Sequence, residues 1–164
     1  MRPRIIIFLF LSLILFSCNH KNEMLYHTLP VEKEYEPIMH VYDRNATSNE
    51  ELQDMPNLKL VINSKDEFPG ENIMGLEELK ESNIDFHKYT LLLVYYKVPG
   101  VVKDYSYSYA KDFENDIIIF SINYNWDPNS GEEAETVDLF TYCRSAILVS
   151  KISEDNKVEF RLSF

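Results

Sequence analysis

Alternating apolar and polar residues mark the second half of the chain as a series of β-strands. Residues 116–126 alternate along their whole length, so side chains two positions apart share one face of the strand. The face that we expect to look into a core carries Ile118, Phe120, Ile122, Tyr124 and Trp126. The other face becomes polar along its length and carries Ile117, Ile119, Ser121, Asn123 and Asn125. Residues 101–110 also alternate, and the two segments together predict a β-hairpin.

Further strands are predicted on either side of this hairpin. Residues 58–62 form the first of them, and the nearly uniform apolar run at 90–98 predicts a central strand covered on both faces. Residues 137–152 predict one long strand, and residues 157–164 return as the last one. Consecutive strands joined by tight turns indicate an antiparallel sheet.

Helical signals are few and short. Leu76 and Leu79 lie three positions apart among acidic residues, which predicts one short amphipathic helix over residues 75–82. Ser64 and Glu67 have the spacing of a capping box, which predicts a brief helical turn. We therefore expect a mainly β fold, either a small antiparallel β-sandwich or a curled sheet with one short helix at its edge. An α+β fold is the alternative.

The N-terminus has the pattern of a cleaved export signal. Arg2 and Arg4 precede an apolar run over residues 5–16, which is too short to span a bilayer comfortably as a permanent helix. The run leads into Leu15-Phe16-Ser17-Cys18, which resembles the lipobox of bacterial lipoproteins, although its phenylalanine is bulkier than usual. The resemblance implies cleavage before Cys18 and acylation of this residue by fatty acids such as palmitate. An ordinary secretory signal or an uncleaved anchor helix is the alternative.

Three regions follow from this pattern. We predict a lipoprotein signal peptide at residues 1–17, a lipid-anchored tether at 18–56 and a β-rich domain at 57–164. The tether is inferred from polar, charged composition without a sustained period, apart from residues 38–42, which suit a short strand. The net charge is −11, and loss of the signal peptide removes two arginines and no acid, which leaves −13. Such a charge disfavours nucleic acid and anionic lipid headgroups as partners of the folded body.

A second resemblance lies in the run from Ile84 to Val94, which reads Ile-Asp-Phe-His-Lys-Tyr-Thr-Leu-Leu-Leu-Val. Preceded by a short helix, this run is similar to a pattern in small secreted β-domains. They include the C-terminal domain of a protease-complex subunit and many uncharacterised lipoproteins of the Bacteroidota. The resemblance covers residues 58–164 and implies a hairpin followed by a final hairpin. Pro99-Gly100 stands where that pattern has Gly-Gly, so the fold is supported more than the protease partnership.

Residues capable of catalysis or metal binding do not form a recognisable motif in the sequence. No two histidines have helical i, i+4 spacing. If Cys18 is acylated, Cys143 has no partner within the chain, and we interpret it as a buried, inert thiol on a strand. We therefore expect no catalytic residue, no metal and no cofactor. The histidines concerned are His20, His27, His40 and His87.

Aromatic residues offer two candidate binding surfaces. Tyr105, Tyr107 and Tyr109 share one face of a strand, where they either fill the inside of the sheet or form a platform for a sugar or a partner. Trp126 ends its strand beside an acidic loop, and we expect it to emerge at a rim. The candidate binding rim combines stacking area with hydrogen-bond acceptors and consists of Trp126, Asp127, Asn129 and Glu132.

Together these features predict a non-enzymatic, lipid-anchored envelope protein that presents a small β-rich binding or interaction domain. Its expected partners are the membrane, through the acyl anchor, and an envelope protein or glycan. Two alternatives stay open: an accessory or inhibitory subunit of an envelope protease, and a glycan-binding lipoprotein. The resemblance to lipoproteins implies the outer membrane, because Asn19 rather than Asp follows the cysteine. The lack of a dense acidic cluster over residues 19–23 favours the periplasmic face over the cell surface.

Overall fold

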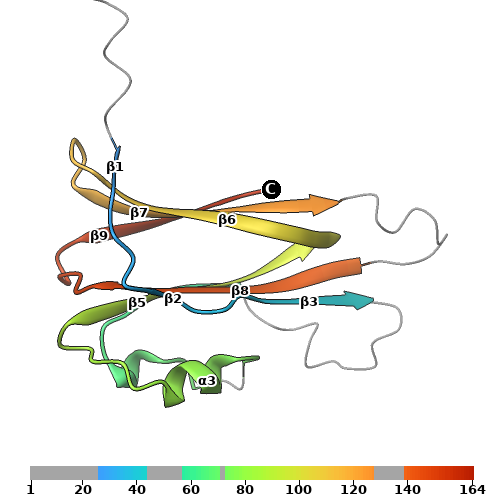
Figure 1. Ribbon diagram of the computed structural model, residues 1–164, viewed down its shortest axis with the longest axis horizontal. Coiled ribbons are helices and arrows are strands. Elements are labelled where there is room, and N and C mark those ends of the chain that lie inside the picture. Colours follow the sequence, from blue (N-terminus) through green and yellow to red (C-terminus); the bar gives the residue numbers. More distant parts are fainter. Residues whose placement is uncertain (1–25, 44–56, 71–72, 128–138) are drawn as a thin grey trace, which may run out of the picture.

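The computed structural model describes residues 26–43, 57–70, 73–127 and 139–164. These residues form three layers, in which two β-sheets pack face to face and a short helix covers the outer face of one sheet (Figure 1). The prediction of a mainly β sandwich with one short helix is confirmed for the described part of the chain.

The first sheet, called sheet A here, has four strands in the order β1-β6-β7-β9. They are β1 (Tyr26–Thr28), β6 (Val101–Asp112), β7 (Ile117–Asp127) and β9 (Lys157–Ser163). β6 and β7 form the predicted hairpin. Its turn is closed by the carboxylate of Asp112, which accepts hydrogen bonds from the backbone N–H groups of Glu114 and Asn115 at 3.0 and 3.2 Å.

The second sheet, sheet B, has five strands arranged around a long central pair. They are β2 (Lys33–Glu34), β3 (Ile38–Asp43), β4 (Leu58–Ile62), β5 (Tyr89–Pro99) and β8 (Leu139–Ser150). β8 pairs with β5 on one side and with both β2 and β3 on the other, and β4 pairs with β5. The helical elements on its outer face are η1 (Lys65–Glu67) and α3 (Leu76–Glu81), which confirms both predicted helical segments. The predicted capping box is not formed, because the Ser64 side chain makes no capping hydrogen bond.

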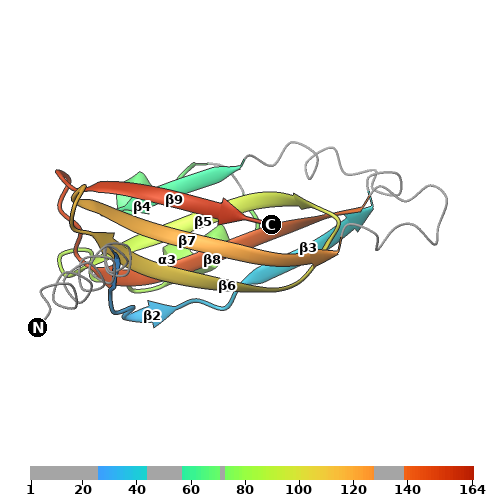
Figure 2. The ribbon, with the colours of Figure 1, turned by 90° about the horizontal axis from the view of Figure 1, so that it is seen from above.

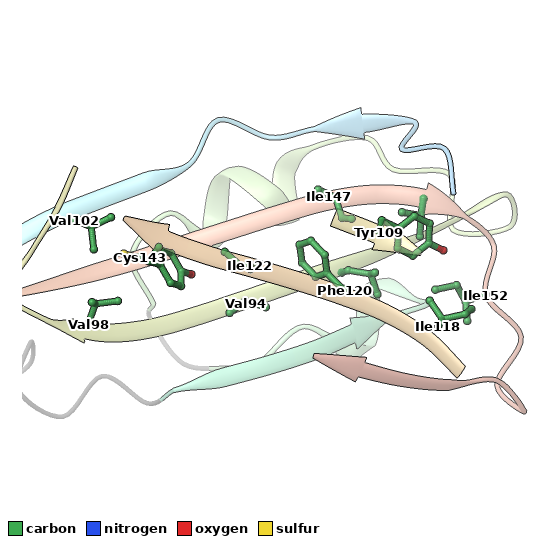
Figure 3. Packing of buried hydrophobic residues seen from close by; sticks show 13 residues of the cluster. Val94, Val98, Val102, Tyr109, Ile118, Phe120, Ile122, Cys143, Ile147 and Ile152 are labelled. Atoms are coloured by element: carbon green, nitrogen blue, oxygen red, sulfur yellow. The ribbon is translucent and has the colours of Figure 1, made fainter. Parts of the chain in front are cut away.

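Two hydrophobic cores result from this layering. The inter-sheet core lies between sheets A and B and contains Leu92, Phe120 and Ile147 (Figure 3). The second core lies between sheet B and α3 and contains Leu91, Leu93 and the two helical leucines. Residues 91–95 are therefore buried on alternate sides of one strand, which confirms that the apolar run is a doubly covered central strand.

The last strand differs from its prediction. We expected β9 to return as an antiparallel neighbour of the strand before it, but β8 lies in sheet B and β9 lies in sheet A, parallel to β7. The connection at residues 151–156 carries the chain from one sheet to the other. Ser153 and Asn156 close its turn, with the Asn156 N–H donating to the Ser153 carbonyl at 3.0 Å. A tight turn fixes a reversal of direction but not which sheet receives the next strand, so the predicted final hairpin is wrong.

The predicted tether is corrected as well, because residues 26–43 belong to the sandwich. β1 pairs with β6 of sheet A, and β2 and β3 pair with β8 of sheet B, so this segment runs along one side of both sheets (Figure 2). Edge strands are held by backbone hydrogen bonds and leave one face to water, so they do not need an alternating apolar pattern. Residues 18–25 and 44–56 of the predicted tether lie outside the described residues.

Candidate functional site

The described part of the candidate rim lies where β7 ends beside the start of β6. Trp126 is paired with Val102 and Asp127 with Val101. The register between the two strands shifts between Val102 and Asp104, which marks a β-bulge at this end. Asn129, Glu132 and Cys18 lie outside the described residues.

Gly100 shapes the backbone beneath this rim. The chain passes from sheet B to sheet A at this residue, whose φ of 93° lies in a region that favours glycine. A Cβ atom here would lie 2.7 Å from the Asp127 carbonyl oxygen and 3.0 Å from Cε3 of Trp126. The indole ring therefore covers a position that only glycine fits, and one side of the ring rests on backbone.

A buried hydroxyl holds this crossing in place. Thr141 on β8 donates from Oγ1 to the Gly100 carbonyl at 2.7 Å and accepts from the Val102 N–H at 3.0 Å. The Gly100 N–H donates to the Leu139 carbonyl at 2.9 Å. Since Thr141 is fully buried, these bonds are shielded from water and fix the start of β6 against sheet B.

Trp126 and Asp127 differ in what they offer to a ligand. Trp126 is half-buried and packs against the inter-sheet core, so only part of its ring is accessible. Asp127 forms an ion pair with Lys103 at 3.0 Å. This end of the sheet therefore presents an aromatic edge together with a carboxylate and an ammonium group, which suits a polar ligand.

The tyrosine stripe faces the interior rather than forming an open platform. Tyr109 is buried, and Tyr105 and Tyr107 are half-buried against the inter-sheet core, which confirms the interpretation that they fill the inner face. Both half-buried hydroxyls donate to the carboxylate of Glu34 on β2, at 2.7 and 3.0 Å. Burial and these hydrogen bonds raise the pKa of both tyrosines. The pair thus joins sheet A to the edge of sheet B.

Cys143 has the environment that we expected of an inert thiol. It lies on β8 within the inter-sheet core and is buried (Figure 3). Burial raises the pKa of its thiol to about 12, so the thiol stays protonated at neutral pH. A protonated, inaccessible sulfur is a poor nucleophile, which disfavours catalysis at this position.

Arg144 is a structural centre that the sequence interpretation missed. Its side chain is 1% exposed and lies between sheet B and α3. Nη1 donates to the Gly75 carbonyl at 2.5 Å and contacts the Glu78 carboxylate at 3.3 Å, while Nη2 donates to the Glu36 carbonyl at 2.8 Å. A single arginine inside an otherwise apolar strand is the signal for such a site, because buried cations are nearly always paired.

The surface above Arg144 is a shallow depression of about 290 Å³. Its lining includes two acids, and the Arg144 nitrogens that reach outward already bind carbonyl oxygens and Glu78. Nε is buried and, within the described part of the chain, has no hydrogen-bond partner. The depression therefore offers no accessible cation to an anionic ligand. Its lining residues are Glu36, Pro37, Ile38, Met39, His40, Glu78 and Arg144.

The described part of the chain contains neither a cluster of metal ligands nor a membrane-spanning helix. In residues 26–43, 57–70, 73–127 and 139–164, no three His, Cys, Asp or Glu residues are grouped so as to hold a metal ion. The helices of these same segments are too short to cross a membrane. Comparison with protein-family models, curated proteins and solved structures found no match to the chain.

Proposed function

We propose that the chain is a lipid-anchored envelope protein that presents its β-sandwich close to a membrane as a non-catalytic binding module. The observation that carries the proposal is the distance between anchor and domain along the chain. Only residues 19–25 separate Cys18 from Tyr26, where the first strand of the described residues begins. A segment of this length reaches at most about 25–30 Å, so the sandwich stays next to the lipid surface.

The end of β7 is the ligand-binding part of this proposal. Trp126 supplies aromatic contact area, and Asp127 and Lys103 supply charge and hydrogen bonds beside it. Thr141 and Gly100 hold the backbone below them, so little ordering is needed on binding. The high pKa of the Cys143 thiol disfavours nucleophilic chemistry at this residue.

Acylation at Cys18 is tested by intact-mass analysis of membrane fractions. The unchanged chain is expected to begin at Cys18 and to carry acyl mass, because its signal segment resembles that of lipoproteins. The Cys18→Ser variant should remain a full-length precursor without acyl mass. The matched control is Cys143→Ser, which removes the other cysteine and should leave processing unchanged. A mature chain that starts elsewhere without added lipid would refute the anchor.

Binding at Trp126 is tested by crosslinking in cells followed by pull-down. The Trp126→Ala variant should recover about ten-fold less of the bound material, as expected for an aromatic residue central to an interface. Phe113→Ala is the control, because Phe113 is 65% exposed and lies at the turn at the other end of the hairpin. It should recover as much as the unchanged chain.

Fluorescence separates a binding residue from a purely structural one. Trp126 is the only tryptophan, so the emission of the chain reports its surroundings directly. Iodide should quench this emission in the free protein, and less so after binding. An unquenchable Trp126, or equal recovery with both variants, would contradict the proposed site. Recovery of polysaccharide would identify a glycan ligand, and recovery of a protease would identify an accessory role.

A further inference from the structure

We propose that β9 is the interface through which two copies of this chain associate, with sheet A continuing from one copy into the other. β9 is one of the two edge strands of sheet A, at the side opposite β1 (Figure 2). It pairs with β7 on one side, and within the described part of the chain no strand pairs with its other side. Alternate backbone N–H and C=O groups of an edge strand point outward and can bind another strand.

The sequence of β9 is complementary to itself when two copies run antiparallel. With Phe160 opposite its own counterpart, Glu159 of each copy lies opposite Arg161 of the other. Val158 then lies opposite Leu162, and all seven residues of the strand are used. Opposite charges and apolar side chains at directly facing positions stabilise a strand pair.

Other alignments of the same strand are less favourable. Centring the pair on Arg161 places two arginines opposite each other, and centring it on Glu159 places two acids opposite each other. A parallel arrangement in register also sets like charges side by side. The alignment centred on Phe160 is therefore selected by charge, and its two-fold symmetry closes the assembly at two copies.

The structure shows that these side chains sit on the faces that the pairing requires. Glu159 and Arg161 lie on the outer face and form an ion pair at 2.7 Å within one chain, so both reach over the same surface. Val158, Phe160 and Leu162 are half-buried and pack against the inter-sheet core. A second β9 would extend the charged row on one face of sheet A and the apolar row on the other.

Among the described residues, a depression borders β9 on its unpaired side. This depression of about 270 Å³ lies between Val61 of β4 and Val158 of β9. The C-terminal Phe164 is 50% exposed and stacks on Tyr96 and Tyr124, where it prolongs the apolar row. The other edge of sheet A is formed by β1, which spans three residues, and by the part of β6 beyond it, whereas β9 offers seven consecutive strand residues.

The experiment measures the mass of the full chain, solubilised in detergent, by sedimentation and native mass spectrometry. The unchanged chain should form a dimer at micromolar concentration. Arg161→Glu and Glu159→Arg each place like charges opposite one another, so each should raise the dissociation constant of the dimer about ten-fold. Lys88→Glu makes the same charge change as Arg161→Glu on an exposed loop and should remain dimeric.

Mixing the two single variants distinguishes contacts between chains from contacts within one chain. In a mixed pair, two acids of one chain face two arginines of the other, although each chain has lost its own ion pair. Equimolar mixing should therefore restore the dimer, and so should the doubly exchanged variant Glu159→Arg/Arg161→Glu. A monomer throughout the titration, failure of the mixture to associate, or a different protein held at β9 would overturn the proposal.

Discussion

Replacing Arg144 with alanine is expected to lower the free energy of unfolding by about 3–5 kcal/mol, because it removes a buried cation together with its partners' hydrogen bonds. The carbonyl groups of Gly75 and Glu36 would lose their donors. A cavity would also open between sheet B and α3. Urea denaturation followed by circular dichroism measures the loss. The stability of Arg144→Lys should lie between those of the unchanged chain and Arg144→Ala, because an ammonium group cannot replace the forked guanidinium.

Glu78→Gln is the matched control for this experiment. Glu78 also contacts Arg144, but its side chain is 67% exposed, so its ion pair is screened by water. Its loss should cost less than about 1 kcal/mol. If Arg144→Ala cost no more than the control, the buried guanidinium would not be what joins α3 and the β2–β3 segment to sheet B.

Phe120→Ala is the second change with a large expected effect. Phe120 is fully buried in the inter-sheet core (Figure 3). Its ring makes edge contacts with Tyr107 and Phe160. Truncation leaves a cavity between two sheets that cannot easily collapse, and the expected loss is about 3–5 kcal/mol. Thermal and urea unfolding measure it.

Phe113→Ala provides the comparison with the same chemistry at the surface. Phe113 is 65% exposed, and its replacement should change stability by no more than about 0.5 kcal/mol. A loss below 1 kcal/mol for Phe120→Ala would place this side chain outside the core and contradict the packing of the sandwich. A domain near the lower limit of ordinary stability, about 5 kcal/mol, would be close to unfolding after either large change.

Strands were predictable from the sequence where the burial of each face sets the pattern of apolar residues. The alternation from Ile118 to Tyr124 identified the buried face of β7 correctly. The apolar run at 90–98 identified a strand with a core on each side. Both signals are local, because each residue's burial depends on the face of the strand that it occupies.

The placement of strands in sheets was not predictable by the same reasoning. β9 alternates as expected, but its parallel pairing with β7 depends on where the connection at 151–156 carries the chain. The segment at 26–43 lacks a pattern because it is held mainly through backbone bonds, including those from Leu29 to Tyr109 and from Tyr35 to Ala146. Backbone hydrogen bonds of this kind do not require particular side chains, so the sequence does not reveal them.

The candidate site was predictable only in part. The end of β7 could be located from the strand pattern, and Trp126 and Asp127 lie there. The ion pair with Lys103 and the hydroxyl of Thr141 come from other strands, so spacing along the chain does not reveal them. The same applies to Glu34, which meets Tyr105 and Tyr107 from the opposite sheet.

The N-terminal segment also determines when the molecule is able to fold. Glu36 binds Arg144, which lies 108 positions later, and Glu32 accepts a hydrogen bond from Ser150, 118 positions later. A growing chain therefore cannot complete sheet B until β8 has been synthesised, or sheet A until its last seven strand residues have followed. Contacts of such long range slow folding to about milliseconds to seconds. During synthesis the strands at 33–43 therefore remain without their β8 partner until most of the chain has been made.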